Sequence, residues 1–139
     1  MGSQPAEVAE DDLREFVSGF YADPLGFVLA CYPWGEPGPL KDHKGPDQWQ
    51  SDFLEAIGAE VKRNAFDGKK PVPSIRRAVS SGHGVGKSTL AAWLVDWIMS
   101  TRPHAKGTIT ANTYHQLTTK TWAAVKYWTS ISTTSHWFI

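Results

Sequence analysis

One short glycine-rich motif, SGHGVGKS at positions 81–88, constrains this 139-residue chain more than any other feature of its sequence. Its three glycines leave the backbone open, so that successive N–H groups can face a phosphate without obstruction by side chains. A helical pattern follows the motif, and the start of a helix carries a partial positive charge that also favours phosphate. The motif therefore predicts a P-loop, the loop that binds the phosphates of a nucleotide.

The expected ligands of this loop are ATP and Mg²⁺. The Lys87 ammonium is expected to reach the β- and γ-phosphates, and the Ser88 hydroxyl is expected to coordinate the metal. The common pattern has Gly at the first position, where this chain has Ser81. A small residue there is typical of helicase-like ATPases. The expected nucleotide-binding residues of the segment are Ser81, Gly82, His83, Gly84, Val85, Gly86, Lys87, Ser88 and Thr89.

Acidic residues for hydrolysis are missing from the expected positions. Hydrolysis needs a carboxylate to hold Mg²⁺ and usually a Glu to activate the attacking water. After Lys87 the chain has no Glu, and its only Asp is Asp96, inside the helix expected after the loop. Between Val95 and Trp97 this Asp is expected on a solvated face. We therefore expect no catalytic residue and a chain that stops before the second acidic motif, Walker B.

The alternation of patterns predicts an α/β fold with a parallel sheet and flanking helices, as in part of a P-loop NTPase. Strands are expected at 74–80 and 107–111, and helices at 88–99 and about 113–128. Two earlier helices are expected at 5–22 and 47–63, separated by a loop rich in Pro and Gly at 32–46. The predicted organisation is an N-terminal helix and loop, 1–46, and the front part of an ATPase domain, 47–139.

Charge is distributed unevenly although the net charge is zero. Residues 1–67 hold 13 acidic side chains against five Lys and Arg, whereas residues 68–139 hold nine Lys and Arg against Asp96 alone. The basic half favours polyanions such as nucleotides or DNA. Mutual neutralisation of the two halves in the folded chain is an equally good interpretation.

Composition also bears on location and metal chemistry. Cys31 is the single cysteine, and no Cys and His cluster has the spacing of a zinc site. The N-terminus is acidic rather than basic and apolar, and no run of 18 apolar residues occurs. We expect an unexported cytoplasmic chain, with most of its seven Trp in the core.

Four segments together resemble the large subunit of bacteriophage terminases, the ATPase motors that package double-stranded DNA into procapsids. They are YPWGEPGPL at 32–40, GPDQWQSDFLEAIG at 45–58, RRAVSSGHGVGKSTLAAWLVDWIMSTRP at 76–103 and GTITANTYHQLTTKTW at 107–122. The resemblance implies double-stranded DNA, a small terminase subunit and a portal or procapsid as partners, in the bacterial host cytoplasm. It also implies that this chain is an N-terminal piece without the nuclease domain.

The resemblance implies roles for particular residues. It gives recognition of adenine to Gln50, beside Trp49, with Gln48 as a competing candidate, because an amide offers both a donor and an acceptor. Burial of Trp49 in the core, with Gln50 on the surface, is the alternative. His83 occupies a position where some terminases carry a catalytic Arg, and a neutral imidazole cannot replace that cation. Lys120 and Lys126 are candidates for phosphate contacts, although a solvated face is the simpler interpretation.

Two other functions remain open. The chain can be a fragment of a helicase or another DNA translocase, since these share the same loop. It can also be a noncatalytic module that holds DNA with its basic half.

Overall fold

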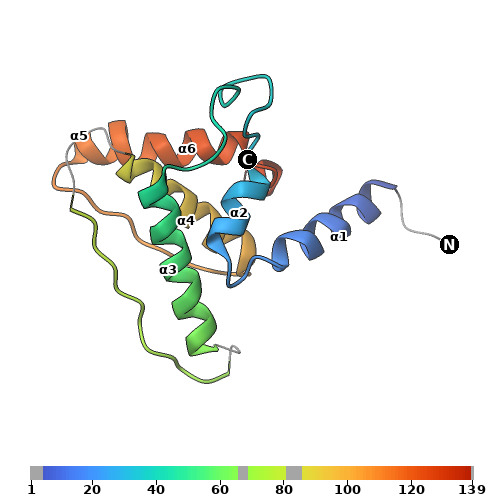
Figure 1. Cartoon of the computed structure of the whole chain (residues 1–139), viewed down its shortest axis with the longest axis horizontal. Helices are drawn as coiled ribbons and strands as arrows, with labels where there is room; N and C mark the ends of the chain where they lie inside the picture. The colour runs from blue at the N-terminus through green and yellow to red at the C-terminus, as the bar shows by residue number, and fades with distance from the viewer. Residues whose placement is uncertain (1–4, 66–68, 81–85, 139) are drawn as a thin grey trace.

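The computed structural model describes residues 5–65, 69–80 and 86–138, and every regular element in these ranges is helical (Figure 1). Three of the helices are short: α5, the π-helical turn η1 and the 3₁₀ turn η2. The elements are α1 (Pro5–Ser18), α2 (Pro24–Cys31), α3 (Gln48–Asn64), α4 (Lys87–Thr101), α5 (Tyr114–Gln116), η1 (Leu117–Thr121), α6 (Trp122–Ile131) and η2 (Ser135–Trp137).

The predicted α/β parallel sheet is wrong for the described part of the chain, which contains no strand. Residues 74–80 and 107–111 are extended there, but no backbone hydrogen bond between the two segments is found in the described ranges. Segment 69–80 instead follows α3, where Arg77 pairs with Glu60 at 2.9 Å and Asn64 donates to the Pro73 carbonyl. Strand propensity depends on a paired neighbour, and among the described residues neither segment has a strand beside it.

Local signals set the ends of α2, α3 and α4. The Asp23 carboxylate accepts a hydrogen bond from the backbone of Gly26 at 2.9 Å, and Pro24 opens α2. α3 starts directly after Asp47, as its sequence predicts. α4 covers the predicted helix 88–99 and ends at Thr101, because the backbone of Arg102, before Pro103, is extended.

α4 is the central helix of the fold, because α1, α2 and α6 all pack against it (Figure 1). Rings from the loop after α2, from α4 and from α6 form one aromatic cluster: Trp93 and Trp128 meet edge to face at 5.2 Å, and Tyr32 meets Trp128 at the same distance. Trp97 is also buried, whereas Trp122 is 46% exposed. Edge-to-face contacts add to the stability that burial provides. Trp34, Trp49 and Trp137 are half-buried and pack against the core. The expectation that most of the seven Trp pack in the core is therefore confirmed.

Arg102 follows the C-terminal end of α4 and contacts the turn after α1. The Arg102 guanidinium lies 3.8 Å from the centre of the Tyr21 ring and 4.5 Å from that of Trp97. It also donates to the Tyr21 carbonyl at 2.9 Å, so it holds the turn after α1 against α4. None of the helices in the described ranges has the length and apolar character needed to cross a membrane.

Candidate nucleotide site

The described part of the predicted P-loop is its C-terminal end, where α4 begins. Ser81, Gly82, His83, Gly84 and Val85 lie outside the described residues, so their predicted contacts stay predictions. Gly86 has φ +90° and ψ 22°, a left-handed conformation that glycine adopts without strain. Lys87, Ser88 and Thr89 form the first turn of α4, with Lys87 exposed and the other two half-buried.

This first turn has the physical properties of an anion site. The first N–H groups of an α-helix have no partner within the helix, and the helix dipole adds a partial positive charge there. The Ser88 hydroxyl lies in the same turn, where Mg²⁺ coordination is predicted. In the described ranges no group of three or more His, Cys, Asp or Glu side chains is placed to hold a metal ion. Metal coordination in this turn is therefore predicted for Ser88 alone, from its place in the motif.

Gln50 connects α3 to the start of α4. Its side chain is 4% exposed, so the interpretation of Gln50 as a surface residue is wrong. Its Nε2 donates to the Gly86 carbonyl at 3.1 Å, and its Oε1 accepts from the backbone N–H of Asp47 at 2.9 Å. Gln48, the competing candidate, is exposed and donates to Asp52 at 2.8 Å. Of the two glutamines, Gln50 is therefore the one in contact with the end of the loop.

Gly86 also leaves room for the Gln50 amide. A Cβ atom at this position would lie 2.6 Å from Gln50 Nε2 and 3.9 Å from a ring carbon of Trp49. Real Cβ contacts are not that short, so any side chain at position 86 would displace the amide. The sequence placed Gly86 in the loop but did not show this contact with α3.

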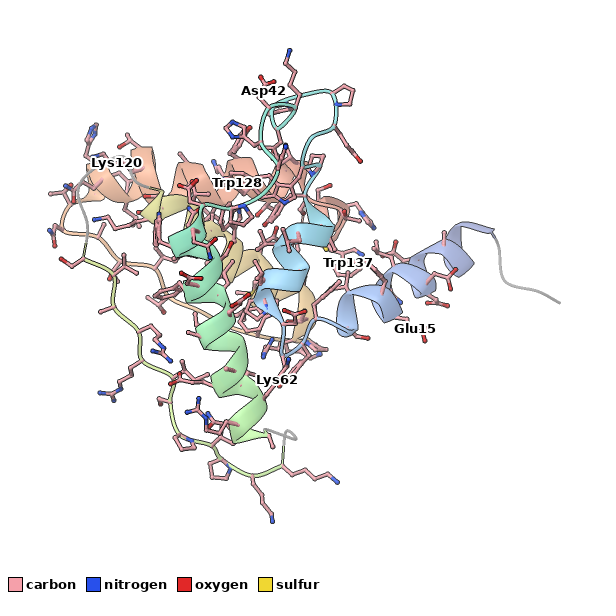
Figure 2. All side chains as sticks on the ribbon, in the orientation of Figure 1. Glu15, Asp42, Lys62, Lys120, Trp128 and Trp137 are labelled. Atoms are coloured by element: carbon pink, nitrogen blue, oxygen red, sulfur yellow. The ribbon has the colours of Figure 1, made fainter. Side chains whose placement is uncertain are left out.

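A cavity of about 200 Å³ lies beside this contact. Its walls come from the loop 34–47, the start of α3, the first two turns of α4, and α6. Thr89 and Trp93 line it from α4, where a spacing of four residues puts them on one face. Trp34 and His43 line it from the loop, whose tip at Asp42 projects away from the helices (Figure 2). Sequence reasoning missed this wall, although the aromatic loop YPWGEPGPL was a visible signal.

One cavity residue carries an unsatisfied polar atom. Trp93 is 2% exposed, and its indole N–H is buried without a hydrogen-bond partner in the described part of the chain. A buried donor left unpaired costs about 1–3 kcal/mol. An unpaired buried donor therefore lies in one of the residues that line the cavity.

Asp96 is not on a solvated face, so that prediction is wrong. Its side chain is 2% exposed, and Oδ2 accepts a hydrogen bond from the Tyr32 hydroxyl at 2.6 Å. Burial raises the pKa of Asp96 to about 6, although the hydrogen bond from Tyr32 lowers it in part, and Oδ1 is buried without a hydrogen-bond partner among the described residues. Burial beside this carboxyl also raises the pKa of Tyr32 and brings the pKa of Cys31 to about 12. Asp96 is buried because α4 has neighbours on several sides.

Asp96 is also remote from the start of α4. It follows Ser88 by eight residues in one helix, which corresponds to about 12 Å along the axis. Its carboxylate is engaged by Tyr32 and cannot serve a metal bound at Ser88. This position agrees with the expectation that Asp96 is not a metal ligand. The reason is its burial against Tyr32 and not the solvated face that the sequence suggested.

The TANT segment contributes a helix start and no buried contact. The Thr113 hydroxyl accepts from the backbone N–H of Gln116 at 3.1 Å and caps α5. Lys120 and Lys126 are exposed, and Lys120 projects at one end of the molecule (Figure 2). Contacts of either lysine with phosphates stay predictions.

Comparisons with protein-family models, with curated proteins and with solved structures found no match to this chain. The resemblance to terminases therefore depends on the motifs quoted above and on no aligned relative.

Proposed function

We propose that this chain binds ATP with Mg²⁺ as the front part of a phage terminase large subunit, the DNA-packaging motor. Its place of action is the bacterial cytoplasm, with the small terminase subunit and the portal as partners. The observation that carries the proposal is the contact between Gln50 and Gly86. It joins two motifs, WQ and GKS, that lie 36 residues apart in the sequence and that the same function requires.

The start of α4 supports the phosphate part of the proposal. Gly86 takes the left-handed conformation that a glycine-rich loop needs, and Lys87 follows at once. The ammonium of Lys87 and the first N–H groups of α4 would together offset the charge of a triphosphate. Ser88 would hold Mg²⁺ through its hydroxyl, and Thr89 would contact the phosphate or the sugar.

Binding without hydrolysis is the expected activity of the chain alone. No Glu follows Glu60, and the only acid after Asp67 is Asp96, which is buried against Tyr32. A carboxylate for the attacking water would have to come from elsewhere.

Titration with MgATP tests the proposal. We expect saturable binding by the 139-residue chain, and we expect Lys87→Ala to weaken it at least about 10-fold through loss of a charge-assisted contact. Lys126→Ala is the matched control, because this lysine is exposed on α6 and lies outside the site. Equal affinity of the chain and Lys87→Ala would refute the proposal. ATP turnover abolished by Lys87→Ala would refute the statement that a catalytic acid is missing.

DNA binding is a second candidate function, supported by a basic surface. The end of α3 and the segment after it expose several cations, seen at the bottom of Figure 2 around Lys62. These cations are Lys62, Arg63, Lys69, Lys70 and Arg76. Double-stranded DNA binding that weakens steeply with salt and persists in Lys87→Ala would support this function. Arg63→Ala should then reduce the salt dependence, whereas Lys126→Ala on α6 should not.

A further inference from the structure

The outer side of α6 and of the turns before it exposes aromatic rings. The exposed residues, called the aromatic face below, are Tyr114 on α5, Lys120 in η1, and Trp122 and Tyr127 on α6. The inner side of α6 packs against α4 through Trp128, so the helix cannot turn these rings inward. Aromatic rings are enriched in protein–protein interfaces. The aromatic face is therefore suited to a partner.

Charge narrows the kind of partner that fits the aromatic face. The chain has no Asp or Glu after Asp96, and Asp96 itself is buried and bound to Tyr32. Lys120 and Lys126 are both exposed in this part of the chain. A complementary surface therefore combines acidic side chains with apolar area, because opposite charges across an interface guide association and fix its register.

α1 has a surface of this kind. Its residues Asp12, Glu15 and Phe16 are exposed, and we call them the acidic face. Asp12 and Glu15 lie on the side of the helix away from Val17, which is buried in the core. Glu10 is bound to η2 and helps to hold α1 in this orientation. The fold therefore keeps the two acids and the Phe16 ring directed outward.

The acidic face and the aromatic face lie far apart in one molecule. Figure 2 shows Glu15 toward the right end and Lys120 at the left end, and Figure 1 shows α1 and α5 separated along the longest axis. A single chain therefore cannot join its own two faces, whereas a second copy can. The helices also match in length, because α1 has 14 residues and η1 and α6 have 5 and 10, which gives about 20 Å for each side.

We propose that copies of this chain associate head to tail, with α1 of one copy on the aromatic face of the next. Acids of α1 lie near Lys120 of the neighbour, and Phe16 and Trp122 form the apolar centre of the contact. Nucleic acid is another partner that suits Lys120, but it would leave the acidic face of α1 without a partner. One helix pair is a small interface, so we expect a dissociation constant above about 1 µM. This assembly does not depend on nucleotide binding.

Analytical ultracentrifugation of the 139-residue chain measures the association. The average mass should rise with protein concentration, and it should fall when added salt screens the charges across the contact. A chain that stays monomeric at millimolar concentration would refute the proposal.

Two variants block opposite faces of the chain. Trp122→Ala removes a ring from the aromatic face, and Glu15→Lys reverses a charge on the acidic face; each should raise the dissociation constant at least about 10-fold. Their matched controls are Leu29→Ala on α2 and Glu36→Lys in the loop, both at exposed positions outside the two faces. Unchanged association of Trp122→Ala and Glu15→Lys, with circular dichroism showing folded chains, would place any interface elsewhere and overturn the proposal.

A mixture of Trp122→Ala and Glu15→Lys tests the head-to-tail arrangement itself. Each variant retains the face that the other lacks, so the mixture should form dimers but no larger species. A mixture that associates no better than either variant alone would overturn this arrangement.

The indole N–H resonance of Trp122 separates a second copy from nucleic acid as the partner. The signal is identified by its loss in Trp122→Phe, and it should shift as the concentration of the chain rises. A signal that shifts only when duplex DNA is added, and not with protein concentration, would assign the aromatic face to nucleic acid and refute the proposal.

Discussion

The buried carboxyl of Asp96 should make the stability of this chain depend on pH, and Asp96→Asn should remove that dependence. In the folded chain the pKa of Asp96 is raised from 3.8 to about 6, chiefly by burial. In the unfolded chain the side chain returns to its ordinary value. Each unit of difference corresponds to about 1.4 kcal/mol, so ionisation of Asp96 costs the folded state about 3 kcal/mol.

The sign follows from the direction of the shift. Because the folded pKa is higher than the unfolded one, the favourable contribution is complete below about pH 3.8. It is lost as the pH rises, and the loss is complete above about pH 6. Glu10 acts in the opposite direction, since hydrogen bonds from Trp137 and His136 lower its pKa. Comparison of the chain with Asp96→Asn at each pH cancels the effect of Glu10.

Urea unfolding followed by tryptophan fluorescence, at pH 4, 5, 6 and 7, measures this effect. At pH 4 the chain and Asp96→Asn should differ little in free energy of unfolding. At pH 7 the variant should be the more stable by up to about 3 kcal/mol, because the neutral amide has no charge to desolvate. Asp42→Asn, at an exposed loop position, is the control for removal of a negative charge. A difference between the chain and Asp96→Asn that is the same at pH 4 and pH 7 would refute the reasoning.

Three other substitutions test single contacts of the fold. Tyr32→Phe removes the only donor that contacts Asp96 Oδ2 in the described part of the chain; it should lower the free energy of unfolding at pH 7 by about 1–3 kcal/mol, with a smaller effect at pH 4. Gly86→Ala should destabilise the chain in urea by about 1–3 kcal/mol, because it strains a φ of +90° and crowds Gln50; no change would contradict the described start of α4. Arg102→Lys should lower the unfolding midpoint by an amount that corresponds to about 1–2 kcal/mol, since an ammonium cannot both stack on two rings and reach the carbonyl; an unchanged midpoint would show that the stacking contributes little.

Local sequence signals predicted the principal helices well. The expected helices at 47–63 and 88–99 correspond to Gln48–Asn64 and Lys87–Thr101, because caps and apolar spacing act within a few residues. The helix expected at 5–22 ends at Ser18, and the apolar piece after it forms a separate helix, Pro24–Cys31. The helix expected at 113–128 is interrupted by the π-helical turn Leu117–Thr121. These differences are modest and concern the ends and regularity of elements.

Strand formation could not be predicted in the same way. β-Branched residues in segments 74–80 and 107–111 favour an extended backbone, and these segments are extended. A strand also needs a neighbour for its N–H and C=O groups, and that neighbour is supplied by other parts of the chain. Composition within a segment contains no information about whether the neighbour is in place.

The candidate site shows the same division between local and distant contributions. The motif at 81–88 and the WQ pair could be found in the sequence. The sequence could not show which of Gln50 and Gln48 contacts the end of the loop. Tertiary structure made that choice, because it places Gln50 of α3 within hydrogen-bond distance of Gly86, the residue before α4. Asp96 is the clearest case. Its neighbours Val95 and Trp97 suggested an exposed position, and its burial depends on Tyr32, which lies 64 residues earlier in the chain. The identity of a contact across that separation is decided by how the helices pack and cannot be inferred from either segment alone.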